Sequence, residues 1–278
     1  MAGVSPFHNG AAGDDLVIEA GSTLSMNSAT ANGNVVMLLN SGSTGKVSGT
    51  LSLLNTGTQR ISSAAAAPGS LVFANGSKFI SNVTSASTSY PFGSNSQSTE
   101  KWVVFEAGAS LYYEGGYSPM GNNSTYSAIN FLPGSNWYHR ANNGTGSFVN
   151  NKSFGNIIVE NNATLTSDGP IYRIGNLTIS AGSSFTTHTS GHTAVFGNLT
   201  VDGSLTAPAG SSNTLVMGGS TPQTVSGSGT LTVPTFTVAD NSEVILDRSI
   251  TVSTAANIYG KINFNGNQIL GGGTSLPV

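Results

Sequence analysis

Short apolar runs that alternate with polar residues recur along the whole chain, and they predict short β-strands. In Leu177-Thr-Ile179, Leu199-Thr-Val201 and Leu231-Thr-Val233 the apolar side chains stand two residues apart. A strand places residues i and i+2 on one face, so this pattern predicts a buried face and an exposed face. We find no window that combines helical apolar spacing with a capping box. The chain is therefore predicted to be all-β.

One sequence unit occurs three times in close succession. Phe154-Gly-Asn-Ile-Ile-Val159 is followed by Ile174-Gly-Asn-Leu-Thr-Ile179 and by Phe196-Gly-Asn-Leu-Thr-Val201, so the copies start 20 and then 22 residues apart. A nearly constant period of this length is typical of repeat architectures, in which each unit stacks on the one before it. We expect Ile179, Leu199 and Val201 to point into one continuous core.

A second template overlaps the first. It consists of an apolar residue, two spacers, Gly or Asn, Ser or Ala, one spacer and a second apolar residue. Gly and Asn tolerate the positive φ that a tight corner between strands requires. Its copies cover residues 18–24, 73–79, 105–111, 131–137, 159–165, 179–185 and 238–244. Val201-Asp-Gly-Ser-Leu205 is the same template with one residue deleted.

These repeats favour a right-handed parallel β-helix, a solenoid with two or three short strands in each period. Each coil would stack on the previous one at about 4.8 Å, with inward Val, Ile, Leu and Phe forming ladders. We predict one solenoid over residues 1–278 with about ten to twelve coils. A β-sandwich array, which has turn signals about every 8–12 residues, is the alternative.

Two stretches depart from the regular repeat. Residues 83–101 are predicted to form a long polar loop. Residues 111–153 hold most of the aromatic side chains, and we interpret them as a region of larger insertions on the same solenoid.

Composition narrows the classes of function. The net charge is −3 and the nine Lys and Arg residues are scattered, whereas a nucleic-acid-binding protein needs a basic stripe. No apolar run approaches the roughly 20 residues of a membrane-spanning helix. The chain has no cysteine, so disulfides and thiolate metal sites are impossible. The ends resemble neither a signal peptide nor a natural stop, so we expect part of a longer chain.

A family resemblance rests on several segments. They are Met217-Gly-Gly-Ser-Thr-Pro-Gln-Thr-Val-Ser-Gly-Ser-Gly-Thr-Leu-Thr-Val233, Ile262-Asn-Phe-Asn-Gly-Asn-Gln-Ile-Leu270, Phe131-Leu-Pro-Gly-Ser135 and Phe154-Gly-Asn-Ile157. These segments resemble the repeat regions of large Bacteroidetes surface and gliding-type adhesins. The resemblance spans residues 100–273. It implies a secreted protein at the cell surface, usually exported by the type IX system.

The aromatic stretch supplies the candidate ligand-binding residues. They are Tyr112, Tyr113, Tyr117, Trp137, Tyr138 and the neighbouring Arg140. Exposed aromatic faces bind sugars and proteins well, so a surface polysaccharide or another cell-surface protein is the expected partner. The alternative is that these rings pack beneath the loops as a second core.

Metal and cofactor sites are not expected. His188 and His192 have the spacing of a metal-binding pair, but they lie in a Gly/Ser/Thr segment without a nearby acid. We therefore predict a loop there. Asp14 and Asp15 could bind Ca²⁺, with a polar N-terminal edge as the alternative.

Catalytic chemistry has weak support. A β-helical hydrolase needs paired carboxylates, whereas Asp168, Asp202, Asp240 and Asp247 stand singly. A lyase would need a base, for which Lys152 and Arg173 are the candidates. We predict a non-enzymatic, extracellular structural or adhesive segment. A glycan-binding module and, further behind, a β-helical polysaccharide lyase or hydrolase are the alternatives.

Ice binding is a further alternative, because Thr178, Thr200, Thr232 and Thr251 share one place in Leu/Ile-Thr-Val/Ile strands. That function needs Thr at a constant place in every coil. Earlier coils carry Ile158 or Ser52 instead.

Overall fold

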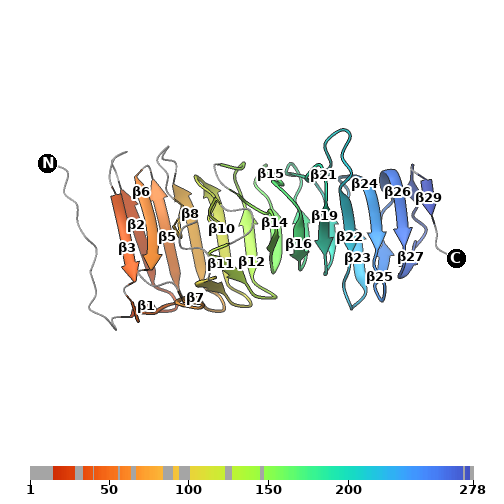
Figure 1. Ribbon diagram of the computed structural model, residues 1–278. Helices are drawn as coiled ribbons and strands as arrows, with labels where there is room; N and C mark the ends of the chain where they lie inside the picture. The colour runs from red at the N-terminus through yellow and green to blue at the C-terminus, as the bar shows by residue number, and fades with distance from the viewer. Residues whose placement is uncertain are drawn as a thin grey trace. The chain divides into compact units, whose positions relative to one another are not determined.

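The chain folds into parallel β-helical coils. The computed structural model describes residues 15–28, 34–39, 41–55, 57–63, 67–83, 90–93, 101–122, 127–144, 147–271 and 273–275. Within these ranges every regular element is a strand, and the strands pair in parallel between successive coils (Figure 1). The prediction of a parallel β-helix is confirmed, and the β-sandwich alternative is wrong.

Contacts divide the chain into two compact units, Met1–Phe148 and Val149–Val278. The boundary falls inside the 111–153 stretch that we interpreted as an insertion region. Both units are β-helical, and a single solenoid over residues 1–278 stays a prediction.

The first unit forms its coils from three sheets. One contains β1 (Leu16–Ile18), β4 (Gly45–Val47), β7 (Leu71–Phe73), β9 (Val103–Phe105) and β11 (Ile129–Phe131). The next contains β2 (Thr23–Ser28), β5 (Thr50–Asn55), β8 (Lys78–Val83), β10 (Ser110–Gly115) and β12 (Asn136–His139). The third pairs β3 (Asn34–Leu39) with β6 (Thr58–Ser63).

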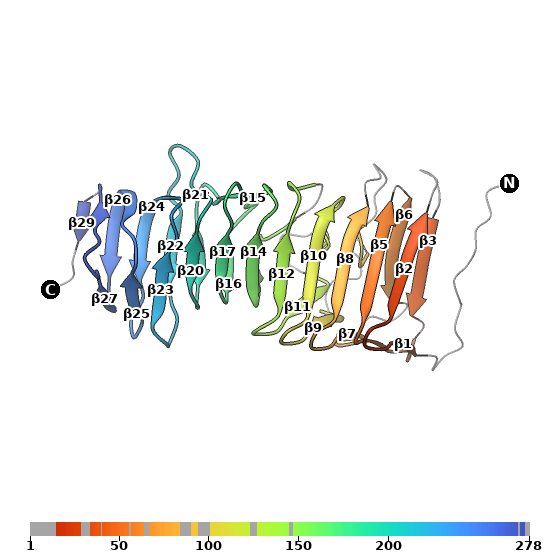
Figure 2. The same ribbon diagram turned by 180° about the vertical axis from the view of Figure 1, so that it is seen from behind.

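We divide the strands of the second unit into three sets, called sheets I, II and III, of which II and III are joined through the long strands β24 (Thr230–Val238) and β26 (Ile250–Ile258) (Figure 2). Sheet I contains β14 (Asn156–Val159), β17 (Leu177–Ile179), β20 (Leu199–Val201), β23 (Gln223–Ser226), β25 (Glu243–Leu246) and β27 (Lys261–Asn263). Sheet II contains β15 (Thr164–Thr166), β18 (Ser184–Thr186), β21 (Ser204–Thr206), the first parts of β24 (Thr230–Val238) and β26 (Ile250–Ile258), and β28 (Ile269–Leu270). Sheet III contains β13 (Lys152–Ser153), β16 (Ile171–Ile174), β19 (His192–Val195), β22 (Thr214–Met217), the second parts of β24 and β26, and β29 (Gly273–Ser275).

Each coil contributes one strand to a given sheet, so the number of strands in that sheet gives the number of coils. The second sheet of the first unit has five strands and sheet I has six. Together they agree with the ten to twelve coils predicted.

Inward side chains form ladders because parallel strands stack in register. In the first unit Phe105 stacks on Phe73 with 4.4 Å between ring centroids and on Phe131 with 5.2 Å. In the second unit Ile179 pairs with Val201, and both are fully buried, as is Leu199. The predicted continuous core is confirmed for this unit. Complete burial of one such side chain contributes about 1.5–3 kcal/mol.

The second template forms the corners that we predicted. Its seven Gly or Asn residues all have φ between 58° and 85°, the left-handed region. In each copy the next residue donates a backbone hydrogen bond to the residue three positions earlier, for example Ser77 N–H to Ala74 O at 3.0 Å. In six copies that next residue is a buried Ser or Ala, because the corner leaves room only for a small side chain.

The Gly-Asn repeat forms a different kind of corner, between sheets III and I. Gly175 does not have positive φ; a Cβ there would lie 2.1 Å from Gly155 O. Glycine is therefore needed at this corner because neighbouring coils approach closely, and not for a positive φ. The Asn side chains form a ladder: the Asn156 carboxamide oxygen accepts the Asn176 N–H at 2.9 Å, and that of Asn176 accepts the Asn198 N–H at 2.8 Å.

The 83–101 stretch contributes to the core as well as to a loop. Val83 ends β8, and residues 84–89 and 94–100 lie outside the described residues. Tyr90 and Phe92 between them are buried, and Phe92 packs on Phe79 with 4.6 Å between centroids. A purely polar loop is therefore too simple a prediction.

We expect Val201→Asp to lower the free energy of unfolding by about 4 kcal/mol, since it places an unpaired charge in the core. Thr200→Asp is the matched control, because Thr200 is half-exposed and directly precedes Val201 in the same strand. Urea denaturation followed by circular dichroism measures both. Equal destabilisation of the two variants would contradict the inward and outward alternation of β20.

We expect Gly175→Ala to cost several times more stability than Gly76→Asn. The first change forces a Cβ against backbone, whereas Gly76 has φ of +80° and open space around it. Asn adopts positive φ at little cost, as Asn162 and Asn241 do in the same template. Thermal melting of both variants tests this, and a larger loss for Gly76→Asn would refute the two explanations.

Candidate functional site

Strand alternation divides the candidate aromatic residues into two groups. Tyr113 on β10 and Trp137 on β12 are fully buried and pack with His139 and Phe148. Their side chains therefore cannot contact a ligand at the surface, which corrects that part of the expected site. The alternative of a packed aromatic core holds for these two residues.

The Tyr113 hydroxyl explains why a tyrosine occupies this core position. It donates a hydrogen bond to Gly116 O at 2.7 Å and accepts one from the Gly144 N–H at 2.9 Å. Burial raises the pKa of Tyr113 to about 12. The hydroxyl thus joins two loops of the first unit.

The outward residues of the same strands form a surface cluster. Tyr112 and Tyr138 stack with 4.6 Å between centroids and an interplanar angle of 12°. The Arg140 guanidinium lies 4.3 Å from the Tyr112 centroid, and its Nη1 is 3.2 Å from Glu114 Oε1. We call these four residues the Tyr–Arg cluster. The fifth expected surface aromatic, Tyr117, packs edge-on against Tyr90 instead.

The cluster presents a preorganised surface. Parallel register places Tyr112 opposite Tyr138 on one side and opposite Ile80 on the other, so two rings and an aliphatic side chain form one column. Stacking and the cation–π contact restrict the rotamers before any ligand arrives, which reduces the entropic cost of binding. Ring edges, two phenol hydroxyls and one guanidinium suit a polar ligand with apolar patches.

The histidine pair lies at a loop and a strand start. His188 Nδ1 is 3.2 Å from Ser190 O, and the His192 ring is 5.8 Å from that of Tyr172. Among the described residues no three His, Asp or Glu side chains gather in a group that could hold a metal ion. Asp14 lies outside the described residues. The Asp15 carboxylate accepts hydrogen bonds from the Thr44 N–H and hydroxyl, both at 2.8 Å, which lower its pKa.

Three single carboxylates fasten one coil to the next. Asp168 accepts the Val149 and Asn150 N–H groups, Asp202 accepts the Ser228 N–H and Asp247 accepts the Asn265 side chain. Asp240 is exposed at a turn. Of the two lyase-base candidates, Lys152 is 5% exposed and Arg173 lies over the Phe196 ring at 4.6 Å.

Two polar side chains that sequence reasoning did not single out also connect coils. Arg248 donates to Val201 O at 2.9 Å and to Gly229 O. Gln223 is fully buried; it accepts the Gly219 N–H at 2.7 Å and donates to Val195 O at 3.1 Å. In the sequence, Gln223 could have been noticed only through the Gln-Thr-Val-Ser-Gly segment, which is part of the family resemblance.

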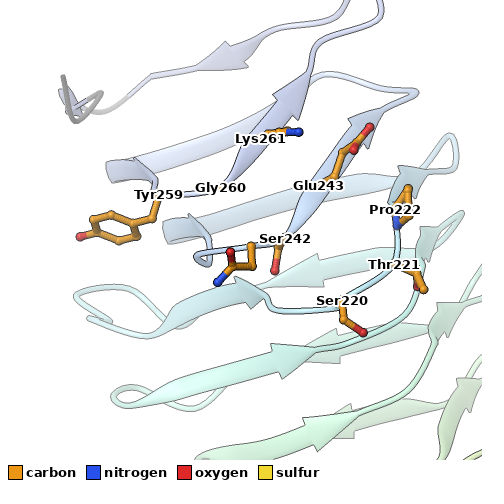
Figure 3. Close-up of a pocket in the computed structure, with 9 residues that line it drawn as sticks. Ser220, Thr221, Pro222, Ser242, Glu243, Tyr259, Gly260 and Lys261 are labelled. Atoms are coloured by element: carbon orange, nitrogen blue, oxygen red, sulfur yellow. The ribbon is translucent and has the colours of Figure 1, made fainter.

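An open groove of about 390 Å³ lies in the second unit (Figure 3). Its lining residues are Ser220, Thr221, Pro222, Asn241, Ser242, Glu243, Tyr259, Gly260 and Lys261. Glu243 and Lys261 are opposite each other on β25 and β27, and Figure 3 shows Tyr259 projecting away from them. Most of the residues that line the groove are polar.

Comparison of the chain with protein-family models, curated proteins and solved structures found no match. In the part of the chain that the structure describes, no helix is long and apolar enough to cross a membrane. The parallel pairing of strands between coils defines the class of the protein as a parallel β-solenoid.

Lys152 gives a pH-dependent prediction. Burial lowers its pKa to about 8, although Asp168 nearby opposes that shift. A lowered lysine pKa means that the folded state disfavours the charge, so stability is reduced below pH 8 and recovers as pH rises toward the unfolded pKa near 10.5.

We expect Lys152→Met to stabilise the chain at pH 7, with a gain of up to roughly 3 kcal/mol that shrinks between pH 8 and 10.5. Urea denaturation across that pH range measures the gain, with Lys261→Met at an exposed position as control. A stability gain that stays constant between pH 8 and 10.5 would contradict the lowered pKa of Lys152 in the folded state.

Proposed function

We propose that this chain is a non-enzymatic, extracellular structural or adhesive segment of a bacterial surface protein, which spaces or presents binding surfaces. The observation that carries the proposal is the coil-by-coil repetition within each unit, with a continuous apolar core and a variable exterior. Stability of such a fold is approximately additive by repeat, which suits a spacer. It is reached without disulfides, because every added coil extends the core.

The family resemblance supports the same conclusion. Phe154-Gly-Asn-Ile157 and the Gln-Thr-Val-Ser-Gly segment resemble repeats of Bacteroidetes surface adhesins, and in this fold they occupy a coil corner and a buried connection between coils. Residues that resemble a family at positions required for coil stacking favour a shared architecture. The surface location and the type IX export route follow from that resemblance.

The second candidate function is glycan binding by the Tyr–Arg cluster. The stacked Tyr112 and Tyr138 rings with Arg140 favour it, because phenol and guanidinium groups combine apolar area with hydrogen-bond donors that sugar hydroxyls accept. Aromatic and Arg side chains are also the residues that most often dominate binding energy. A surface polysaccharide is the partner that we propose.

We expect the Tyr112→Ala/Tyr138→Ala double variant to bind polysaccharide at least about tenfold more weakly than the wild type, a loss of about 1.4 kcal/mol. The assay is a glycan array followed by affinity measurements on the best ligand. Tyr172→Ala is the control, because Tyr172 is 52% exposed and lies in the second unit.

Circular dichroism melting establishes that each variant is folded. Unchanged binding by the folded double variant would remove the glycan-binding role of the cluster and leave the spacer role. Release of sugar products during the assay would contradict a non-enzymatic function.

A further inference from the structure

Sheet II carries a regular array of hydroxyl side chains. Five successive coils place a Ser or Thr, an apolar residue and a Thr in the same order: Thr164-Leu-Thr166, Ser184-Phe-Thr186, Ser204-Leu-Thr206, Thr230-Leu-Thr232 and Ser249-Ile-Thr251. The strands pair in register, Thr166 with Thr186, Thr186 with Thr206, and Thr232 with Thr251. Ser204 pairs with Thr230 between them. We call these five triplets the hydroxyl array.

The array has two columns of outward hydroxyls over one column of core residues. The middle residues Leu165, Phe185, Leu205, Leu231 and Ile250 are all buried. The flanking Ser and Thr residues are half-exposed or exposed. Strand geometry puts the two columns about 6.7 Å apart and successive rows about 4.8 Å apart. The Ser184 hydroxyl donates to the Thr164 hydroxyl at 2.9 Å, so these two rows are joined directly.

The other two sheets of the same unit show that strand propensity alone does not produce this regularity. Thr favours strands, so some Thr is expected on any outer face. On sheet I the outward column reads Ile158, Thr178, Thr200 and Ser226. On sheet III one outward column reads His192, Thr214, Thr235 and Ala255. In sheet II, by contrast, the last residue of every triplet is Thr, so one outward column consists of Thr in all five coils.

We propose that the hydroxyl array binds the surface of ice crystals. An ice surface is a repeating lattice of water oxygens, and each water contributes only a weak contact. Binding therefore requires many identical groups on a flat, periodic face, whose small contributions add because they are held in one rigid body. Threonine suits this role because its hydroxyl bonds to water while its methyl group and stiff χ1 hold it in place.

Side-chain chemistry favours ice over other ligands. The fifteen residues of the array include no charged side chain, and fixed charges would hold water in arrangements that do not match a crystal. The array has no outward aromatic ring, the group on which sugars usually stack. The sequence had suggested Thr178, Thr200, Thr232 and Thr251 as one column, but the first two lie on sheet I and the last two on sheet II. The proposal goes beyond the spacer and glycan-binding functions, because it assigns a different ligand to a different surface.

The test measures the retention of the full chain on growing ice and its inhibition of ice recrystallisation. The test variant is Thr186→Lys/Thr206→Lys, at the centre of the array. The matched control is Thr178→Lys/Thr200→Lys, which makes the same change in the same coils on sheet I. We expect the wild type and the control to be active, and the test variant to lose at least tenfold in activity.

Melting curves show whether both variants fold. If the lysines prevent folding, Thr186→Val/Thr206→Val replaces the test variant. Valine keeps the shape of the threonine side chain but removes its hydroxyl. A wild-type chain without activity on ice, or equal losses in the test and control variants, would overturn the proposal. Retention on insoluble polysaccharide but not on ice, lost in the test variant, would also overturn it and assign the array to a polysaccharide. Failure here leaves the glycan assay of the Tyr–Arg cluster unaffected, since the residues and the ligand differ.

Discussion

Parallel hydrogen bonding between successive coils is the constraint on which the rest of each unit depends. Because each strand pairs in register with the strand one coil away, a side chain is repeated at the same place in every coil. Inward places must then be apolar and of compatible size, as in the Phe73, Phe105 and Phe131 ladder. Corner places must fit between backbones about 4.8 Å apart, and this explains why a Cβ at Gly175 or Gly203 would meet a carbonyl oxygen.

The same constraint leaves some backbone N–H and C=O groups at the corners without a strand partner, and a few polar side chains bond to them. Corner carbonyls and N–H groups that no strand satisfies are bonded by Asn156, Asn176 and Asn198 on the surface and by Gln223 in the interior. An unsatisfied buried backbone group costs about 1–3 kcal/mol, so the buried contacts of Gln223 matter for stability. Lys152 is the opposite case, since its buried amine weakens the fold at neutral pH.

Outward side chains are aligned by the same register, but they need not be apolar or small, and the two units carry different side chains there. In the first unit, register brings Tyr112 and Tyr138 together and places Arg140 over the ring, which gives a compact cluster with aromatic and charged character. In the second unit, register aligns Ser and Thr residues of five coils into a regular array without charge. Repetition along the coils turns a single side-chain position into an extended surface, and the two binding functions proposed above depend on this property.

The sequence by itself determined the fold class, the coil period, the corners at Gly76 and Asn162, and the core positions of Ile179 and Val201. It could do so because these features depend on neighbours in one template, and strand alternation is local. The second template already placed Leu111 and Trp137 at apolar positions, but only the structure showed that Tyr113 lies on their buried side of the strands while Tyr112 and Tyr138 lie outside. Tertiary structure also decided that Thr186 and Thr206 share a face that Thr178 and Thr200 do not. Those placements depend on which sheet each strand joins, and that is set by contacts about 20 or more residues away along the chain.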